Sequence, residues 1–107
     1  MDEEITAEEL HALLETGEDI TIVDIRSAEA FERGHIPGSL NLPFHRLPQQ
    51  IERLNGTERV VTVCPHGKAS LQAARLIRSY EGTQTARVES LREGLVGWPF
   101  DLERTDE

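Results

Sequence analysis

The feature that most constrains the fold is an apolar run that passes through a short glycine-containing loop into a helical segment. The run Val60–Val63 has the composition of a buried strand, and Leu71–Ile77 has that of a helix. Between them lies Cys64-Pro65-His66-Gly67-Lys68-Ala69-Ser70, which holds the only cysteine and the only lysine of the chain. This order predicts an α/β fold in which the loop lies at the carboxyl edge of the sheet, where such folds bind ligands.

Helix and strand signals alternate along the rest of the chain. Thr6 and Glu9 fit a capping box before a helix over Ala7–Glu15, and Gly17 closes that helix. Further helices are expected over Ala28–Arg33, from Pro48 to about Leu54, and over Ser70–Tyr80. Strands are expected over Ile20–Asp24, Ser39–Leu42, Arg59–Val63 and Ala86–Glu89, with a helical turn over Gly94–Trp98. The order predicts one domain over 1–107, with a small, mainly parallel sheet and helices on both faces.

Composition limits the class of protein. The chain has 107 residues and a net charge of −9, from 20 acidic and 11 basic residues. This balance argues against nucleic acid and anionic membrane surfaces as partners. A single cysteine excludes an internal disulfide and fits a reducing compartment. No stretch is apolar enough to span a membrane and the start is acidic, so a cytoplasmic protein is expected, with a frayed charged tail over 101–107.

The position of Cys64 allows two interpretations. Amide N–H groups at a helix start, together with the helix dipole, favour a thiolate, which is a nucleophile at neutral pH. A lone cysteine in a globular chain is otherwise a small buried hydrophobe. Cys64 ends the apolar run rather than lying inside it, and turn residues follow at once. The sequence therefore keeps a reactive thiol open beside the structural interpretation.

Three motifs resemble those of one known family. Val23–Arg26, Phe31–Ser39 and Asn41–Pro43 together resemble the first signature of rhodanese domains. Cys64–Ser70 is similar to the active-site loop of that family, and Ser90–Trp98 resembles its closing motif. The match runs from about 20 to 98, and in length and loop the chain looks most like the single-domain thiosulfate sulfurtransferases. It departs at Glu93, where the family has a glycine, and at Pro65, which has no N–H to offer the bound sulfur.

The resemblance implies a rhodanese-like α/β fold and a sulfur relay without a cofactor. Cys64 is then the catalytic nucleophile: it takes sulfur from a small anionic donor such as thiosulfate and passes it from a persulfide to a thiol, to cyanide or to a protein acceptor. The main-chain N–H groups from His66 to Ser70, including that of Ala69, are expected to surround the sulfur. Gly67 supplies the backbone freedom that the loop requires.

Four side chains near the loop each have two interpretations. Lys68 either adds positive charge for a dianionic donor or is an ordinary solvated side chain. Ser70 either caps the helix or donates its hydroxyl to the substrate. His66 either polarises the donor or faces water. Arg26 either binds substrate or pairs with Asp24 or a neighbouring acid, and the ion pair is favoured.

The same residues bear on other possible functions. The scattered His11, His35 and His45, with one cysteine, form no convincing metal set, and His35 is expected to be structural. A cysteine phosphatase requires an arginine six residues after the cysteine, where this chain has Ser70. A persulfide carrier for a partner enzyme, or a non-catalytic rhodanese-like binding module, stays open as an alternative.

Overall fold

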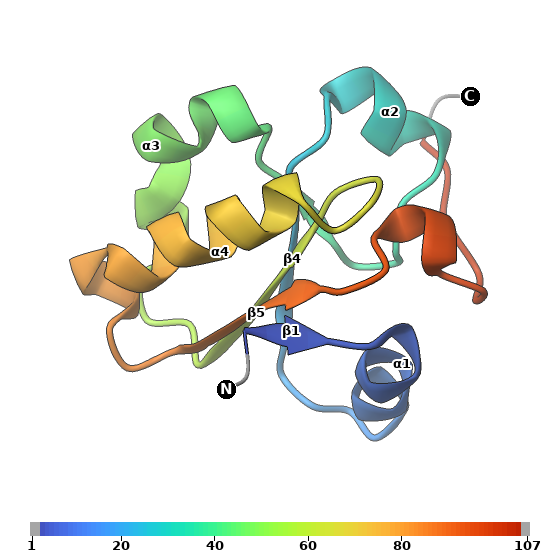
Figure 1. Cartoon of the computed structure of the whole chain (residues 1–107), viewed down its shortest axis with the longest axis horizontal. Helices are drawn as coiled ribbons and strands as arrows, with labels where there is room; N and C mark the ends of the chain where they lie inside the picture. Colours follow the sequence, from blue (N-terminus) through green and yellow to red (C-terminus); the bar gives the residue numbers. More distant parts are fainter. Residues whose placement is uncertain (1–2, 106–107) are drawn as a thin grey trace.

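The computed structural model describes residues 3–105 (Figure 1). Five parallel strands within this range form one sheet. The strand order is β1 (Glu4–Ile5), β5 (Arg87–Leu91), β4 (Arg59–Val63), β2 (Thr21–Asp24) and β3 (Leu40–Asn41). Parallel pairing places all carboxyl ends at one edge. Asp24 lies beside Val63, and the Ile25 N–H donates to the Val63 carbonyl at 3.0 Å. The predicted α/β class is confirmed, and Cys64 lies at that edge.

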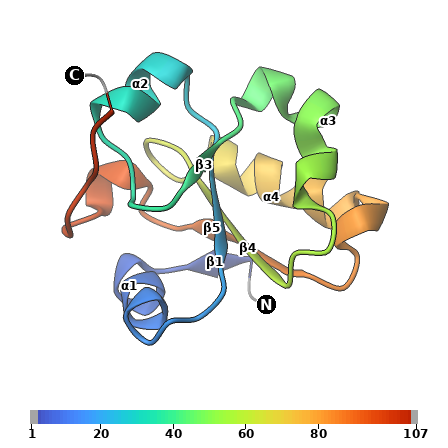
Figure 2. The same cartoon turned by 180° about the vertical axis from the view of Figure 1, so that it is seen from behind.

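Helices cover both faces of the sheet. They are α1 (Ala7–Glu15), α2 (Ala28–Arg33), α3 (Leu47–Gln50) and α4 (Ala69–Ser79), with 3₁₀ turns at Phe44–Arg46, Ile51–Leu54, Glu81–Thr83 and Leu95–Gly97. Figures 1 and 2 show α3 and α4 on one side of the sheet and α1 on the other. None of the helices within residues 3–105 is long and apolar enough to cross a membrane.

The alternation of side chains along β4 divides the core in two. Val60 and Cys64 pack with Ala73 and Ile77 of α4 and their neighbours, whereas Val61 and Val63 pack in the cluster on the α1 side. Successive residues of a strand point to opposite faces, and both faces of a parallel sheet are buried. Cys64 therefore faces α4, the helix whose first turn follows the loop.

Several elements match the sequence-based prediction because their signals are local. The bounds of α1, α2 and β4 are the predicted ones. In front of α1, the Glu9 N–H donates to Thr6 Oγ1 at 3.1 Å and the Thr6 N–H donates to Glu9 Oε1 at 3.0 Å. This is the predicted capping box, which satisfies two of the free N–H groups at the start of α1.

Other elements differ from the prediction. β1 was not predicted, β5 extends to Leu91, and α3 is one turn that continues as a 3₁₀ helix. β1 exists because it pairs with β5: the Ser90 N–H donates to the Glu3 carbonyl at 2.8 Å and the Arg92 N–H to the Ile5 carbonyl at 2.9 Å. A two-residue strand carries no periodicity of its own, so only its partner defines it.

Backbone hydrogen bonds join the described end of the chain to the segment around α2. The His35 N–H donates to the Glu103 carbonyl at 2.9 Å, and the Glu103 N–H donates to the His35 carbonyl at 2.8 Å. The Thr105 N–H donates to the Glu32 carbonyl at 2.9 Å. Residues 103–105 thus contact the end of α2, while the frayed tail over 101–107 stays a prediction and its last residues, 106–107, lie outside the described residues.

Candidate active site

Cys64 follows β4 directly, and its sulfur lies inside the loop that leads into α4. The Gly67 N–H donates to Sγ at 3.1 Å and the Ser70 N–H at 3.2 Å. Ser70 Oγ also lies 3.2 Å from Sγ. Cys64 is 2% exposed, so these groups replace most of the water around the sulfur. Convergent N–H groups of this kind stabilise a negative charge.

The hydrogen bonds determine the ionisation of the thiol. Burial by itself raises the pKa of Cys64, because it removes water from the charged form. The Ser70 hydroxyl, the Ser70 N–H and the N–H groups of His66 and Gly67 act in the opposite direction, and their combined effect lowers the pKa below its ordinary value. A lowered pKa increases the thiolate fraction, the nucleophilic form, at neutral pH.

Two glycines fit the loop against the segment that follows β5. Gly67 has φ +84°, and a Cβ there would collide with the carbonyl of Arg92. Gly94 has φ +74°, and a Cβ there would collide with the backbone of Pro65 and His66. The Leu95 N–H donates to the Cys64 carbonyl at 2.8 Å. The closing motif therefore packs against the loop and holds its conformation. The close approach of the two segments explains why positions 67 and 94 are glycine.

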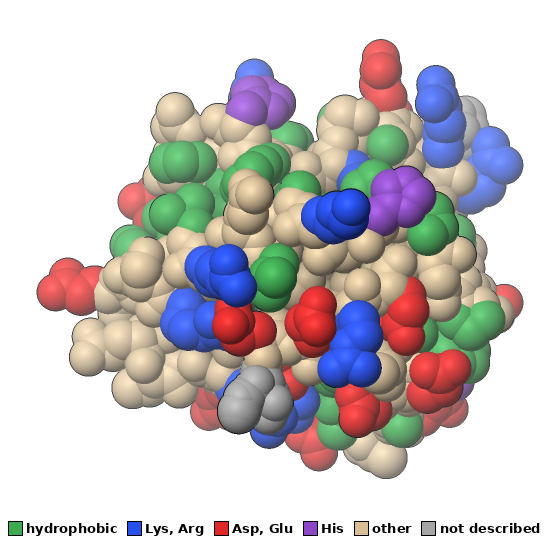
Figure 3. All heavy atoms as spheres, viewed as in Figure 1, with side chains coloured by type: hydrophobic (Ala, Val, Ile, Leu, Met, Phe, Trp, Pro, Cys, Tyr) green, Lys and Arg blue, Asp and Glu red, His purple; other side chains and the backbone are tan. Residues whose placement is uncertain are grey.

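The rim of the loop is exposed and carries positive charge. Pro65, His66 and Lys68 are exposed, and Ala69 is half-buried. Among the described residues, no carboxylate lies within ion-pair distance of Lys68. In Figure 3 most of the Asp and Glu side chains of this face gather over β1, β5 and α1, whereas a cationic side chain and a histidine lie over the loop. The acidic chain thus leaves a local positive site at its thiol.

Ser70 does not cap α4. The helix begins at Ala69, its N-cap is Lys68, and no side chain caps it. Ser70 is instead the second residue of the helix and is fully buried, with its hydroxyl directed at Cys64 Sγ and at Ser90. The capping interpretation is therefore wrong, because Cys64 Sγ occupies the place that a cap would take and accepts the Ser70 N–H.

Arg26 forms the pair that the sequence favoured. Its Nη2 lies 2.7 Å from Asp24 Oδ2, and it also donates to the Gly34 carbonyl at 2.7 Å. The guanidinium is 12% exposed and Asp24 is 1% exposed. Arg26 thus ties β2 to the end of α2, and its binding of substrate stays a prediction.

The two departures from the family pattern have local consequences. Glu93 Oε1 accepts the Ala7 N–H at 3.2 Å, so this side chain helps to hold the first turn of α1. Pro65 lacks an N–H, but the amides that contact Sγ come from residues further along the loop. The donors that contact the sulfur are therefore the Gly67 and Ser70 amides, and Pro65 adds none.

His35 is structural, as expected. Its Nδ1 lies 2.7 Å from the Phe31 carbonyl, and its ring stacks on that of Phe31 with centroids 3.8 Å apart. Within residues 3–105, no group of three or more His, Cys, Asp or Glu side chains could hold a metal ion.

Ser90 is a site residue that sequence reasoning missed. It is fully buried on β5, and its Oγ lies 2.7 Å from Ser70 Oγ. The predicted strand ended at Glu89, so Ser90 appeared only as the first residue of the closing motif. No spacing in the sequence indicates this contact, because it depends on the pairing of β4 with β5.

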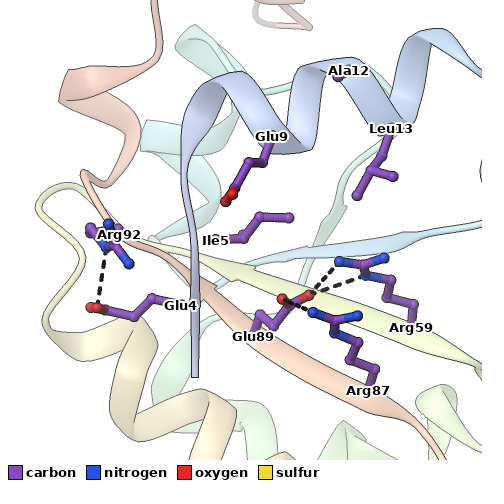
Figure 4. A pocket seen from close by; sticks show the side chains of 9 residues that line it. All are labelled: Glu4, Ile5, Glu9, Ala12, Leu13, Arg59, Arg87, Glu89 and Arg92. Carbon is purple, nitrogen blue, oxygen red and sulfur yellow. Dashed lines mark hydrogen bonds and ion pairs between the residues drawn. The ribbon is translucent and has the colours of Figure 1, made fainter. Parts of the chain in front are cut away.

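A pocket of about 490 Å³ lies between α1 and the sheet. Figure 4 shows that Glu89 points into it and pairs with Arg59 and Arg87. The other lining residues are Glu4, Ile5, Glu9, Ala12, Leu13 and Arg92. Three glutamates face three arginines there, so the charges of the lining cancel.

The comparisons with known proteins define the class. The chain matches the rhodanese-like domain family over residues 6–99 and belongs to that family. It is 36% identical over 96 residues to a sulfurtransferase of Allochromatium vinosum, covering 89% of this chain and 86% of that protein. It is 33% identical to the thiosulfate sulfurtransferase GlpE of Stutzerimonas stutzeri, covering 96% of this chain and 94% of the relative.

A solved structure agrees on the fold. The crystal structure of a thiosulfate sulfurtransferase from Pseudomonas aeruginosa superimposes with a TM-score of 0.85 at 24% identity. It covers 98% of this chain and 21% of that chain, so this protein spans about a fifth of it. The predicted resemblance to rhodanese domains is confirmed, and the family supports a sulfurtransferase of the rhodanese type.

Proposed function

We propose that this protein moves sulfane sulfur from a small anionic donor such as thiosulfate to a thiol or cyanide through a persulfide on Cys64. The observation that carries the proposal is the coordination of Cys64 Sγ by two loop amides and the Ser70 hydroxyl. Such an arrangement favours a thiolate for attack and then a persulfide anion. The relatives named sulfurtransferases support the same chemistry.

The reaction has two displacement steps. The Cys64 thiolate attacks the outer sulfur of thiosulfate, a Sγ–S bond forms, and the S–S bond of the donor breaks with its electron pair leaving on sulfite. An acceptor anion such as cyanide then attacks the terminal sulfur, forms thiocyanate and returns the Cys64 thiolate. No net oxidant or reductant is required, and the two steps predict ping-pong kinetics.

Intact-protein mass spectrometry tests the proposal directly. After incubation with thiosulfate, the protein is expected to gain one sulfur atom that cyanide removes, and Cys64→Ser is expected to gain none. A folded protein with a free Cys64 that gains no sulfur from thiosulfate contradicts the proposed donor. Loading by a partner protein would then favour the carrier, and no loading at all would favour the binding module. The cytoplasmic location and a protein acceptor stay predictions.

A further inference from the structure

Three side chains from three elements form a buried row behind the sulfur. Ser70 Oγ on α4 lies 3.2 Å from Cys64 Sγ and 2.7 Å from Ser90 Oγ on β5. Ser70 and Ser90 are both 0% exposed, and Cys64 is 2% exposed. Water therefore does not reach the two hydroxyls, and they interact with each other and with the sulfur.

The sheet fixes the far end of this row. In the parallel ladder of β4 and β5, Thr62 lies beside Ser90. Thr62 points to the α4 side, where its Oγ1 donates to the Ser70 carbonyl at 2.7 Å. Ser90 on the neighbouring strand points the same way, so its hydroxyl lies under the first turn of α4. The register between β4 and β5 therefore determines where the Ser90 side chain lies.

The number of hydrogens in the row depends on the state of Cys64. The three groups can form two hydrogen bonds, one between Cys64 and Ser70 and one between Ser70 and Ser90. A thiol and two hydroxyls carry three hydrogens, one more than these two hydrogen bonds require. Among the described residues, Ser90 Oγ has no hydrogen-bond partner other than Ser70 Oγ. In the thiol state one buried hydrogen therefore has no acceptor, which is costly.

The thiolate state removes the surplus hydrogen. Ser70 then donates its hydroxyl to Sγ, and only the Ser90 hydroxyl can donate to Ser70 Oγ. A hydroxyl that accepts a hydrogen bond is a stronger donor itself, because the two bonds polarise each other. When Sγ carries the negative charge, both hydroxyl hydrogens of the row therefore have an acceptor.

We propose that Ser90 is a positioning residue for Cys64: by donating to Ser70 Oγ it directs the Ser70 hydroxyl to Sγ and favours the thiolate. Its importance for sulfur transfer rests on the proposed function. Its effect on the thiolate can be measured without any sulfur donor, so the two proposals can fail separately.

The test compares variants at position 90 by the pH dependence of Cys64 alkylation with iodoacetamide. Ser90→Ala is expected to raise the apparent pKa of Cys64. At any fixed pH below that pKa, the alkylation rate of the variant is expected to be about three- to tenfold lower than that of the wild type. Ser90→Thr, which keeps the hydroxyl, is expected to titrate near the wild type. Thr83→Val is the matched control: it removes a buried hydroxyl that donates to the Tyr80 carbonyl after α4. It is expected to lower stability without moving the Cys64 titration.

A cavity left by alanine could unfold the protein, so Ser90→Val and Ser90→Thr form a second pair. They have nearly the same volume and differ in the hydroxyl. Equal Cys64 titrations in the folded Thr and Val variants would overturn the role of Ser90. If the titrations differ but thiosulfate never loads the wild type, Ser90 keeps its effect on the thiolate, and the proposed donor is wrong instead.

Discussion

The amides that surround Cys64 Sγ depend on one backbone conformation at Gly67. Its φ of +84° is one that L side chains rarely adopt, and the Arg92 carbonyl occupies the space of a Cβ. Gly67→Ala is therefore expected to lower the free energy of unfolding by about 2–3 kcal/mol and to slow Cys64 alkylation at neutral pH. Chemical denaturation and alkylation kinetics measure the two effects.

Gly56 provides the matched control for this substitution. Its φ is +79°, and nothing lies within 4 Å of the position of its Cβ. Gly56→Ala therefore carries the backbone strain without the collision and is expected to cost about 1 kcal/mol. It should leave Cys64 alkylation unchanged. Equal stability losses in the two variants would show that the contact with Arg92 is unimportant.

The exposed charge of Lys68 predicts a dependence on the charge of the donor. Because the chain is acidic and Lys68 has no carboxylate partner among the described residues, its ammonium is available to a dianion at the thiol. Lys68→Ala is expected to lower kcat/KM for thiosulfate about tenfold and that for a neutral organic trisulfide much less. Lys68→Arg keeps the charge and serves as control. Equal losses with both donors would refute the electrostatic role.

At this scale the sequence predicted where Cys64 lies, at the carboxyl edge of the sheet, but not all of its surroundings. Cys64 and Gly67 stand in a loop whose composition is informative by itself, and the Asp24–Arg26 pair follows from short spacing. For Ser70 the sequence left capping and hydroxyl donation open, because a serine near a helix start ordinarily caps it, and the structure excludes only the cap. Its actual partners, Cys64 Sγ and Ser90, depend on where α4 begins and on the pairing of two strands.

At the scale of elements, β4, the loop and α4 together surround Cys64 Sγ with hydrogen-bond donors. Burial raises the pKa of Cys64, and the hydrogen bonds from Ser70 and the loop amides together outweigh it, so the pKa is lowered in the folded protein. A lowered pKa adds stability that is complete above the unfolded value and is lost as the pH falls through the folded value. The stability of the wild type relative to Cys64→Ser is therefore expected to rise with pH between these two values.

Urea denaturation of both proteins across neutral and alkaline pH measures this difference. The slope is expected not to exceed about 1.4 kcal/mol per pH unit, which corresponds to one proton. A difference that stays constant over the whole range, or one that falls as the pH rises, would contradict a stabilised thiolate. Serine at position 64 does not titrate there, so other groups cancel in the comparison.

Elements with local signals were predictable and elements made by pairing were not. Thr6 with Glu9 begins α1, and Ser27 begins α2 by accepting the Ala30 N–H at 3.2 Å. β1 has two residues, and the last two residues of β5 are strand because they pair with it. The pattern of side chains inside one segment cannot show a partner more than eighty residues away.

At the scale of the whole molecule, the sheet separates the reactive loop from a buried charge. Glu89 is 2% exposed on the α1 side of β5, Arg87 begins the same strand, and Arg59 begins the neighbouring β4 (Figure 4). Arg59 Nη2 lies 3.0 Å from Glu89 Oε1, and Arg87 Nη2 lies 3.3 Å from Oε2. Cys64 lies beyond the opposite end of β4, on the α4 side. The ion pairs of Glu89 and the hydrogen bonds around Cys64 Sγ are therefore made by different residues.

This separation predicts a change in stability without a change in chemistry. Arg59 is 20% exposed and binds Glu89 through two nitrogens, whereas Arg87 is 60% exposed and binds it through one. Arg59→Met leaves a buried carboxylate with its weaker partner and is expected to lower the free energy of unfolding by about 2–4 kcal/mol. Arg87→Met, the matched control, is expected to cost less than about 1 kcal/mol. Both folded variants should keep the Cys64 alkylation profile of the wild type, and a shifted profile in either one would show that the sheet couples its two ends.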